Sequence, residues 1–255
     1  MIEPATHTFQ SGDGLTLAYH EVGDGRPAVL LHGYISAAHE TWLRTGAADG
    51  LLADGRRLIM PDMRGHGQSA RPHDAGAYPR DALVDDVQTL IARLDLTDYD
   101  LAGYSLGARI AARLMAVGAR PQRAVLGGTG LEPVIHATGR GDNYRQMFAR
   151  MGTSEPGTPE AQMEEHMTSI DADPVALLHV FETFVDTPLE ALGTVQVPTL
   201  VIAGEDDTAR GSVEDLAAAL PQGRLRRVDG DHLTTLLGPQ FRDAMAAFLA
   251  GREPA

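Results

Sequence analysis

A serine between two glycines is the first feature of this sequence that could do chemistry. The segment 103–107 reads Gly-Tyr-Ser-Leu-Gly, follows the apolar run Tyr99–Ala102 and precedes a stretch with helical periodicity. A serine on a sharp strand-to-helix turn needs small flanking residues because the backbone there is strained and closely packed. The pattern predicts a nucleophilic hydroxyl at Ser105, with an ordinary helix N-cap as the alternative.

A serine hydroxyl is a weak nucleophile near neutral pH, and it requires a base that a carboxylate holds in the correct tautomer. His232 follows the run Arg224–Val228 and is the candidate base; a capping or core histidine is the alternative. Asp207 follows the run Thr199–Ala203 and is the candidate acid. The chain order Ser, Asp, His is the order found on parallel α/β sheets that carry such a serine.

Composition excludes several other chemistries. The 255 residues include no cysteine, and all 21 basic residues are arginine. Disulfides, thiolate metal sites, thiol nucleophiles and Schiff-base lysines are therefore excluded. His136, His166 and His179 lack the short spacing of a zinc site, so we expect no metal and no cofactor.

The charge balance bears on partners and location. A formal net charge of -14, without a dense block of arginines, disfavours nucleic acid and anionic membranes as partners. The first residues do not combine a basic start with an apolar run, so we expect no secretion by such a signal and a cytoplasmic location. The expected partner is a small-molecule substrate of the ester type, bound by a monomer or homodimer.

Short β-branched or leucine-rich runs alternate with helical patterns, which predicts a mostly parallel sheet whose strands are buried on both faces. The predicted strands are Thr16–Tyr19, Ala28–Leu31, Arg57–Met60, Asp100–Ala102, Ala124–Leu126, Thr199–Ala203 and Arg224–Val228. The predicted helices are Pro79–Leu94, Leu106–Val117, Val213–Leu220 and Pro239–Leu249. Glycines around the first run predict that it is half of an antiparallel hairpin.

The alternation stops between residues 131 and 192. This stretch contains scattered amphipathic pieces with methionine and aromatic residues, which predicts a helical cap inserted above the sheet. We therefore expect one core α/β domain in two parts, 1–130 and 193–255, interrupted by a helical cap insertion at 131–192. A mobile loop region is the alternative for the insertion.

Two further motifs make the chain resemble the α/β-hydrolase superfamily, and the resemblance covers nearly the whole chain. Segment 30–34 reads Leu-Leu-His-Gly-Tyr, and segment 61–69 reads Pro-Asp-Met-Arg-Gly-His-Gly-Gln-Ser. The resemblance implies an eight-stranded, mostly parallel sheet with flanking helices and a cap. It also implies an oxyanion hole formed by the backbone N–H groups of Tyr34 and Leu106. Family members place the acid three residues after a glycine, which selects Asp207 over Asp206.

The same resemblance gives supporting roles to other polar residues. It implies that His32 shapes the oxyanion turn, that His66 braces the loop of Arg64, and that Asp62 and Arg64 are loop scaffolding. Asp231 is expected to cap the last helix or to tune the site. The residues expected to line the substrate pocket are Tyr34, Tyr104, Met147, Phe148 and Phe181.

Three functions remain open. The first is hydrolysis of a carboxylic ester, lactone or thioester through an acyl-enzyme on Ser105, with an apolar acyl or alcohol group favoured by the methionine- and phenylalanine-bearing insertion. The second is hydrolysis of a carbon–carbon bond in a vinylogous diketone by the same residues. The third is a ligand binder that retains the triad with little turnover, because fold alone does not prove catalysis. The alanine- and arginine-rich composition is typical of a GC-rich bacterial gene.

Overall fold

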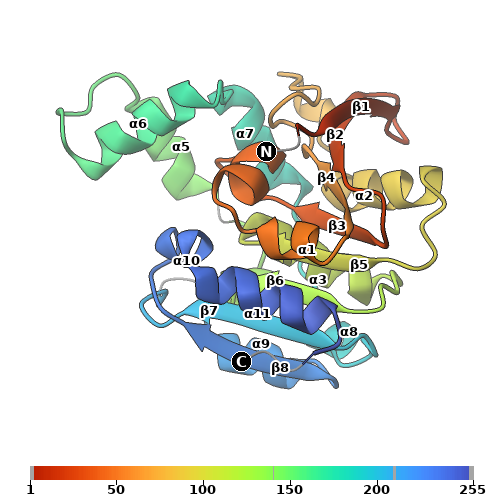
Figure 1. The fold of residues 1–255 in the computed structure, drawn as a ribbon. Helices are drawn as coiled ribbons and strands as arrows, with labels where there is room; N and C mark the ends of the chain where they lie inside the picture. The colour runs from red at the N-terminus through yellow and green to blue at the C-terminus, as the bar shows by residue number, and fades with distance from the viewer. Residues whose placement is uncertain (1–2, 140, 209–210, 253–255) are drawn as a thin grey trace.

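One eight-stranded sheet organises the protein, as seen in a computed structural model that describes residues 3–139, 141–208 and 211–252. The strand order is β1-β2-β4-β3-β5-β6-β7-β8. β1 and β2 are antiparallel to their neighbours, whereas β3 to β8 run parallel to one another. The predicted α/β-hydrolase architecture, with a mostly parallel sheet and flanking helices, is confirmed (Figure 1).

All seven predicted strands are present, and most extend beyond the predicted limits by one to three residues. The strands are β1 (Ala5–Gln10), β2 (Thr16–Val22), β3 (Pro27–Leu31), β4 (Arg57–Pro61), β5 (Asp100–Tyr104), β6 (Ala124–Gly127), β7 (Thr199–Gly204) and β8 (Gly223–Val228). β1 pairs with β2 and completes the expected hairpin. The expectation of burial on both faces is wrong for β8, where Arg224, Arg226 and Arg227 are exposed at the edge of the sheet.

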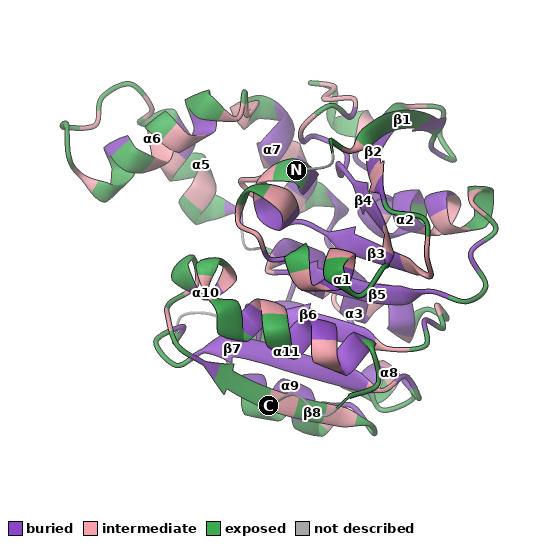
Figure 2. Cartoon of the chain, viewed as in Figure 1, coloured by how far each residue is buried: buried purple, intermediate pink, exposed green. Residues whose placement is uncertain are grey.

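Helices cover both faces of the sheet. One face packs against α1 (Asp49–Ala53) and α11 (Pro239–Leu249), and the other against α2 (Ala82–Arg93), α3 (Leu106–Ala116) and α9 (Val213–Ala219). Side chains alternate accordingly, because successive residues of a strand point to opposite faces. The central strands are consequently buried throughout, whereas solvent-exposed residues concentrate on the outer helix surfaces and on the two edge strands, β1 and β8 (Figure 2).

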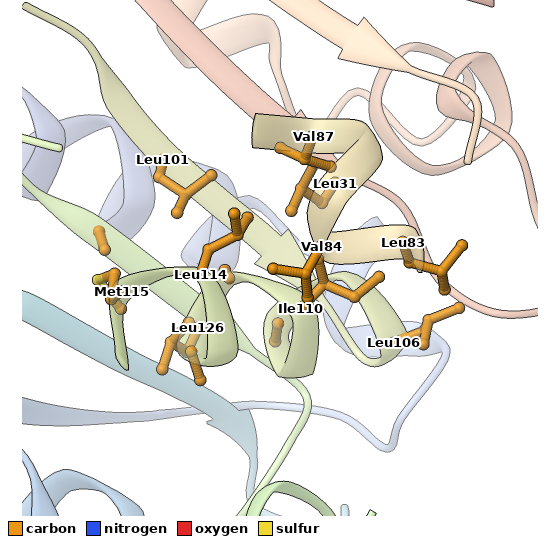
Figure 3. Close-up of a cluster of buried hydrophobic side chains, with 14 of the residues drawn as sticks. Leu31, Leu83, Val84, Val87, Leu101, Leu106, Ile110, Leu114, Met115 and Leu126 are labelled. Atoms are coloured by element: carbon orange, nitrogen blue, oxygen red, sulfur yellow. The ribbon is translucent and has the colours of Figure 1, made fainter. Parts of the chain in front are cut away.

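The packing between α2, α3 and the sheet holds the segment that carries Ser105. Figure 3 shows Val84 and Val87 of α2 beside Ile110 and Leu114 of α3, in the same cluster as Leu31 of β3. The residue after Ser105, Leu106, belongs to this cluster and is buried. The start of α3 is therefore fixed by close-packed apolar contacts rather than by the turn alone.

Segment 131–192 lies between β6 and β7 and is helical in short pieces. Its helices are α4 (Glu132–Ile135), α5 (Asp142–Ala149), α6 (Pro159–Ser169), α7 (Pro174–Val180), the 3-10 turn η3 (Phe181–Thr183) and α8 (Leu189–Leu192). Phe148, Met167 and Leu177 form a small apolar cluster of their own. In Figure 1, α5 and α6 lie apart from the helices that flank the sheet. The division into domains at residues 131 and 192 stays a prediction.

The remaining helical segments are short and lie in connections. They are the π-helical turn η1 (His39–Arg44), the 3-10 turn η2 (Ala75–Ala77) and α10 (Thr234–Leu237). Within the described part of the chain, the structure contains no helix with the length and apolar character needed to span a bilayer.

Candidate active site

Ser105 lies at the carboxyl end of β5, on a backbone conformation that L-residues seldom adopt. Its φ and ψ are 53° and -108°, and α3 begins at the next residue. A Cβ on Gly103 would lie 2.2 Å from the carbonyl oxygen of Gly107, and one on Gly107 would lie 2.0 Å from that of Leu31. Both flanking positions therefore require glycine, and the strain at Ser105 is held in place by the surrounding packing.

The structure brings Ser105, His232 and Asp207 into one hydrogen-bonded chain. His232 Nε2 lies 3.1 Å from Ser105 Oγ, and His232 Nδ1 lies 2.7 Å from Asp207 Oδ2. The Asp207 side chain is 2% exposed and that of His232 is 18% exposed. Asp206, the alternative acid, is exposed. An Nδ1–H that donates to Asp207 leaves Nε2 as the acceptor for the serine hydroxyl proton, which is the arrangement that general-base activation requires.

Two side chains fix the turn that carries His232. Asp231 Oδ1 accepts hydrogen bonds from the N–H groups of Leu233 and Thr234, at 2.9 and 2.8 Å. It therefore fixes the turn that leads into α10, whose N-cap residue is Leu233. The expectation that Asp231 caps the last helix, α11, is wrong, because the N-cap residue of α11 is Gly238. Tyr104 donates its hydroxyl to the carbonyl of His232 at 2.6 Å, which ties this turn to the end of β5.

The turn after β3 lies beside the nucleophile. A Cβ added to Gly33 would lie 3.9 Å from Ser105 Cβ, and Tyr34 is the next residue. Neither the N–H of Tyr34 nor that of Leu106 donates a hydrogen bond to another described residue. Leu106 is also the first residue of α3, where an N–H has no partner within the helix. These two groups are thus available to donate to an oxygen held near Ser105.

His32 fixes the shape of this turn in its neutral form. Its Nε2 accepts a hydrogen bond from the N–H of Met63 at 3.0 Å, and its Nδ1 donates to the carbonyl of Gly33 at 2.7 Å. Complete burial, followed by the neighbouring His66, lowers the pKa of His32 to about 3. A neutral ring is needed here because an imidazolium could not accept from Met63.

Asp62 connects the turn after β3 with the loop after β4. One carboxylate oxygen accepts from the N–H of Ala38 at 2.8 Å, and the other accepts from the N–H of Gln68 at 2.8 Å and faces His20 Nε2 at 3.0 Å. Burial opposes ionisation, but the hydrogen bond with His20 and the backbone donors outweigh it and lower the pKa of Asp62. Asp62 is therefore an ionised crosslink between two loops.

Arg64 has separate partners and holds the far side of the same loop. Its guanidinium makes two hydrogen bonds to Asp86, at 2.8 and 3.0 Å, and two to Asp13, at 2.6 and 2.9 Å. His66 Nδ1 lies 3.0 Å from the carbonyl of Arg64. Asp62 and Arg64 thus contact different parts of the fold rather than each other.

A cavity of about 650 Å³ adjoins Ser105. Its wall includes Ser105 and Leu106, together with Tyr34 and Phe181 from the predicted pocket set. The other predicted members lie elsewhere. Tyr104 is buried beneath His232 with its ring against Phe241, Phe148 packs inside the cluster of the insertion, and Met147 borders that cluster.

Several lining residues were missed by the sequence reasoning. Arg109 lies on α3 one helical turn after Ser105, and Phe184 and Tyr144 come from the insertion. The four-residue spacing from a helix-start serine could have identified Arg109, because residues four apart share a helix face. Nothing in the local pattern distinguishes Tyr144 or Phe184 from the other aromatic residues of segment 131–192. Among the described residues, no group of histidine, aspartate and glutamate side chains could hold a metal ion.

The chain belongs to the alpha/beta hydrolase fold family, whose sequence pattern it matches over residues 27–184. The matched range includes the core strands around Ser105 and much of segment 131–192. The resemblance inferred from the motifs is thereby confirmed at the level of the superfamily.

Similarity to individual proteins is partial in sequence and extensive in fold. The chain is 37% identical over 110 residues to the AB hydrolase superfamily protein YisY of Bacillus subtilis, covering 43% of this chain and 39% of that protein. It is 34% identical over 143 residues to a 2-hydroxymuconate semialdehyde hydrolase of Pseudomonas sp., covering 54% and 49%. The matches thus span less than half of these relatives.

Among solved structures, an esterase (EaEST) from Exiguobacterium antarcticum superposes with a TM-score of 0.78, covering 95% of this chain and 98% of that one. The sequence identity is 21%, so this likeness shows the fold alone.

Proposed function

We propose that the protein is a serine hydrolase that cleaves a small-molecule carboxylic ester, lactone or thioester through an acyl-enzyme on Ser105. The observation that carries the proposal is the chain of contacts from Ser105 Oγ to His232 and from His232 to Asp207, at 3.1 and 2.7 Å. A hydroxyl on a strained elbow with an oriented imidazole is the arrangement that acyl transfer needs.

In the proposed mechanism, Ser105 Oγ attacks the carbonyl carbon while His232 Nε2 accepts the hydroxyl proton. Asp207 holds the Nδ1–H and stabilises the imidazolium that forms. The N–H groups of Tyr34 and Leu106 donate to the oxyanion of the tetrahedral intermediate, a contribution of about 3 kcal/mol per donor. His232 then protonates the leaving alcohol or thiol, and a water molecule, activated by His232, releases the acid and restores Ser105.

The test is release of p-nitrophenol from short- and medium-chain p-nitrophenyl esters. Wild type is expected to turn over, and Ser105→Ala is expected to lose activity by roughly 10⁵- to 10⁶-fold. The matched control is Ser36→Ala. Ser36 lies near the turn after β3, and its hydroxyl contacts Thr41 at 2.8 Å rather than His232. Equal turnover by wild type and Ser105→Ala would contradict the proposal.

A second candidate is hydrolysis of a carbon–carbon bond, favoured by the similarity to the 2-hydroxymuconate semialdehyde hydrolase. The same base and oxyanion donors serve both reactions. Bleaching of a coloured dienol substrate by wild type, without ester turnover, would support this candidate over the first.

A further inference from the structure

Arg109 gives the cavity beside Ser105 a fixed positive charge. Its backbone N–H donates to the carbonyl of Ser105 at 3.2 Å, so the two residues are one helical turn apart. Both side chains line the same cavity. A guanidinium stays protonated at every physiological pH, and this one lies within a protein whose formal net charge is -14.

The Arg109 side chain is held in place by its neighbours. The guanidinium carbon lies 4.1 Å from the centroid of the Phe184 ring, and Nη2 lies 3.4 Å from the carbonyl oxygen of Ala137. Phe184 is itself buried. A stacked and partly buried guanidinium presents a planar set of donors with little conformational freedom left to lose, which favours two-pronged binding of a carboxylate.

The placement of His232 decides which part of a substrate would reach Arg109. His232 gives its proton to the leaving group, so the leaving group must lie on the side of His232. The described residues that line the cavity include Ser105 and Arg109 but not His232. The acyl chain, on the opposite side of the reacting carbonyl, would therefore extend into the cavity toward Arg109.

Other polar groups on the cavity wall are compatible with an anionic acyl chain. Thr129 is buried on the wall and offers a hydroxyl, and Asn143 offers an amide. Asp142 also lines the cavity and would repel an anion, but it is exposed at the start of α5, where solvent and salt screen its charge. The half-buried Arg109 is screened less.

We infer that Arg109 is a specificity-determining residue and that the acyl chain of the substrate ends in a carboxylate, on a chain short enough for the cavity of about 650 Å³. This inference rests on the proposed acyl-transfer function of Ser105. It narrows the substrate class to monoesters or monothioesters of short dicarboxylic acids.

The experiment compares two esters of similar acyl length, mono-p-nitrophenyl glutarate and p-nitrophenyl valerate. Arg109→Gln is expected to lower kcat/KM for the glutarate ester by about 10- to 100-fold, the range for charge-assisted hydrogen bonds. It should change kcat/KM for the valerate ester by less than about threefold, the spread of an ordinary surface substitution. Arg109→Lys keeps the charge without the planar fork, so its kcat/KM for the glutarate ester is expected to lie between those of wild type and Arg109→Gln.

The matched control is Arg113→Gln, one turn further along the same helix. Arg113 pairs with Asp81 at 2.6 and 3.1 Å and does not line this cavity, so the ratio of the two esters should stay at the wild-type value. An unchanged ratio in Arg109→Gln would overturn the inference. An equal fall for both esters would also overturn it, because Arg109 would then serve only to hold Phe184 and Ala137.

A binding measurement separates failure of this inference from failure of the proposed function. Glutarate is titrated by NMR into Ser105→Ala and into the double variant with Arg109→Gln, neither of which needs to turn over. We expect the double variant to bind glutarate at least about tenfold more weakly. Equal glutarate binding by Ser105→Ala and the double variant would contradict a carboxylate site at Arg109, even if the wild type turns over esters. Weaker binding without any ester turnover leaves the site standing and refutes the acyl-transfer function.

Discussion

The sheet edge that carries Ser105 and the insertion that borders the cavity are held together in different ways. Around the sheet edge, polar side chains are buried and have several partners: Arg64 is 2% exposed and bonds to two carboxylates. The turn between α6 and α7 is tied to the core by an exposed pair, Arg71 and Asp171, with side chains 29% and 89% exposed. Buried networks fix geometry, whereas exposed pairs contribute little. The groups around Ser105 are thus rigidly placed, whereas the turn between α6 and α7 is held less firmly to the core.

After the loss of Ser105 itself, the largest expected effect concerns Asp207, the proposed acid of the hydrogen-bonded chain. Asp207→Asn is expected to lower kcat for ester hydrolysis by about 10⁴-fold, because an amide can hold His232 in the wrong tautomer. Asp206→Asn is the control at the adjacent exposed position and should stay within about threefold of wild type, as surface substitutions do. Steady-state kinetics on folded proteins measures both. A larger loss in Asp206→Asn than in Asp207→Asn would show that the acid is assigned to the wrong residue.

The comparison between the two regions is tested by removing one arginine from each. Arg64→Gln leaves Asp13 and Asp86 without their partner, and we expect the free energy of unfolding to fall by about 3–5 kcal/mol. Arg71→Gln removes an exposed pair with Asp171 and should cost less than about 1 kcal/mol. Urea unfolding with a common slope gives both values. Similar losses in the two variants would mean that the insertion is held as firmly as the sheet edge.

A smaller effect is expected from acid, and it also originates at the sheet edge. The pKa of His32 is about 3 in the folded protein and about 6.5 in an unfolded chain. Between pH about 3 and pH about 6.5, His32 is protonated in the unfolded chain and neutral in the folded protein. The free energy of unfolding therefore falls as the pH is lowered from about 6.5 toward about 3, by at most about 1.4 kcal/mol per pH unit for each proton.

Burial also lowers the pKa of His66, which acts in the same direction. Urea midpoints measured from pH 7 to pH 4.5 should show the decline, with a shallower slope in His32→Gln. A slope in His32→Gln equal to that of wild type would mean that His32 is not the group responsible.

The sequence was sufficient to predict that Ser105, His232 and Asp207 lie together, because local backbone requirements mark their positions. Glycine at position 103 reflects a close approach to Gly107 within one strand–turn–helix unit, and glycine at position 107 reflects one to Leu31 on the neighbouring β3. His232 and Asp207 follow strands, and parallel strands deliver their carboxyl ends to one edge of the sheet. The placement of Ser105, His232 and Asp207 together follows from these two facts.

The cavity wall could not be predicted in the same way. Phe148 and Phe181 lie in the same kind of amphipathic segment, yet Phe148 packs within the insertion and Phe181 faces the cavity. Which of these two side chains faces the cavity depends on how the short helices pack against one another. The periodicity within a single helix does not specify that packing. Arg109 was missed because its role comes from its distance to Ser105 rather than from a motif. The burial of β8 was overestimated although its sequence carried the signal: Arg224, Arg226 and Arg227 are three charged side chains in six residues, which a strand buried on both faces would not hold.

The most direct test of acyl transfer through Ser105 is the mass of the protein during turnover. Wild type is mixed with p-nitrophenyl butyrate, quenched in acid within milliseconds to seconds, and analysed intact and after digestion. The mechanism predicts a butyryl adduct on the peptide that contains Ser105, a matching burst of p-nitrophenol, and neither signal in Ser105→Ala. Steady ester turnover without an adduct, or an adduct on another residue that persists in Ser105→Ala, would contradict it.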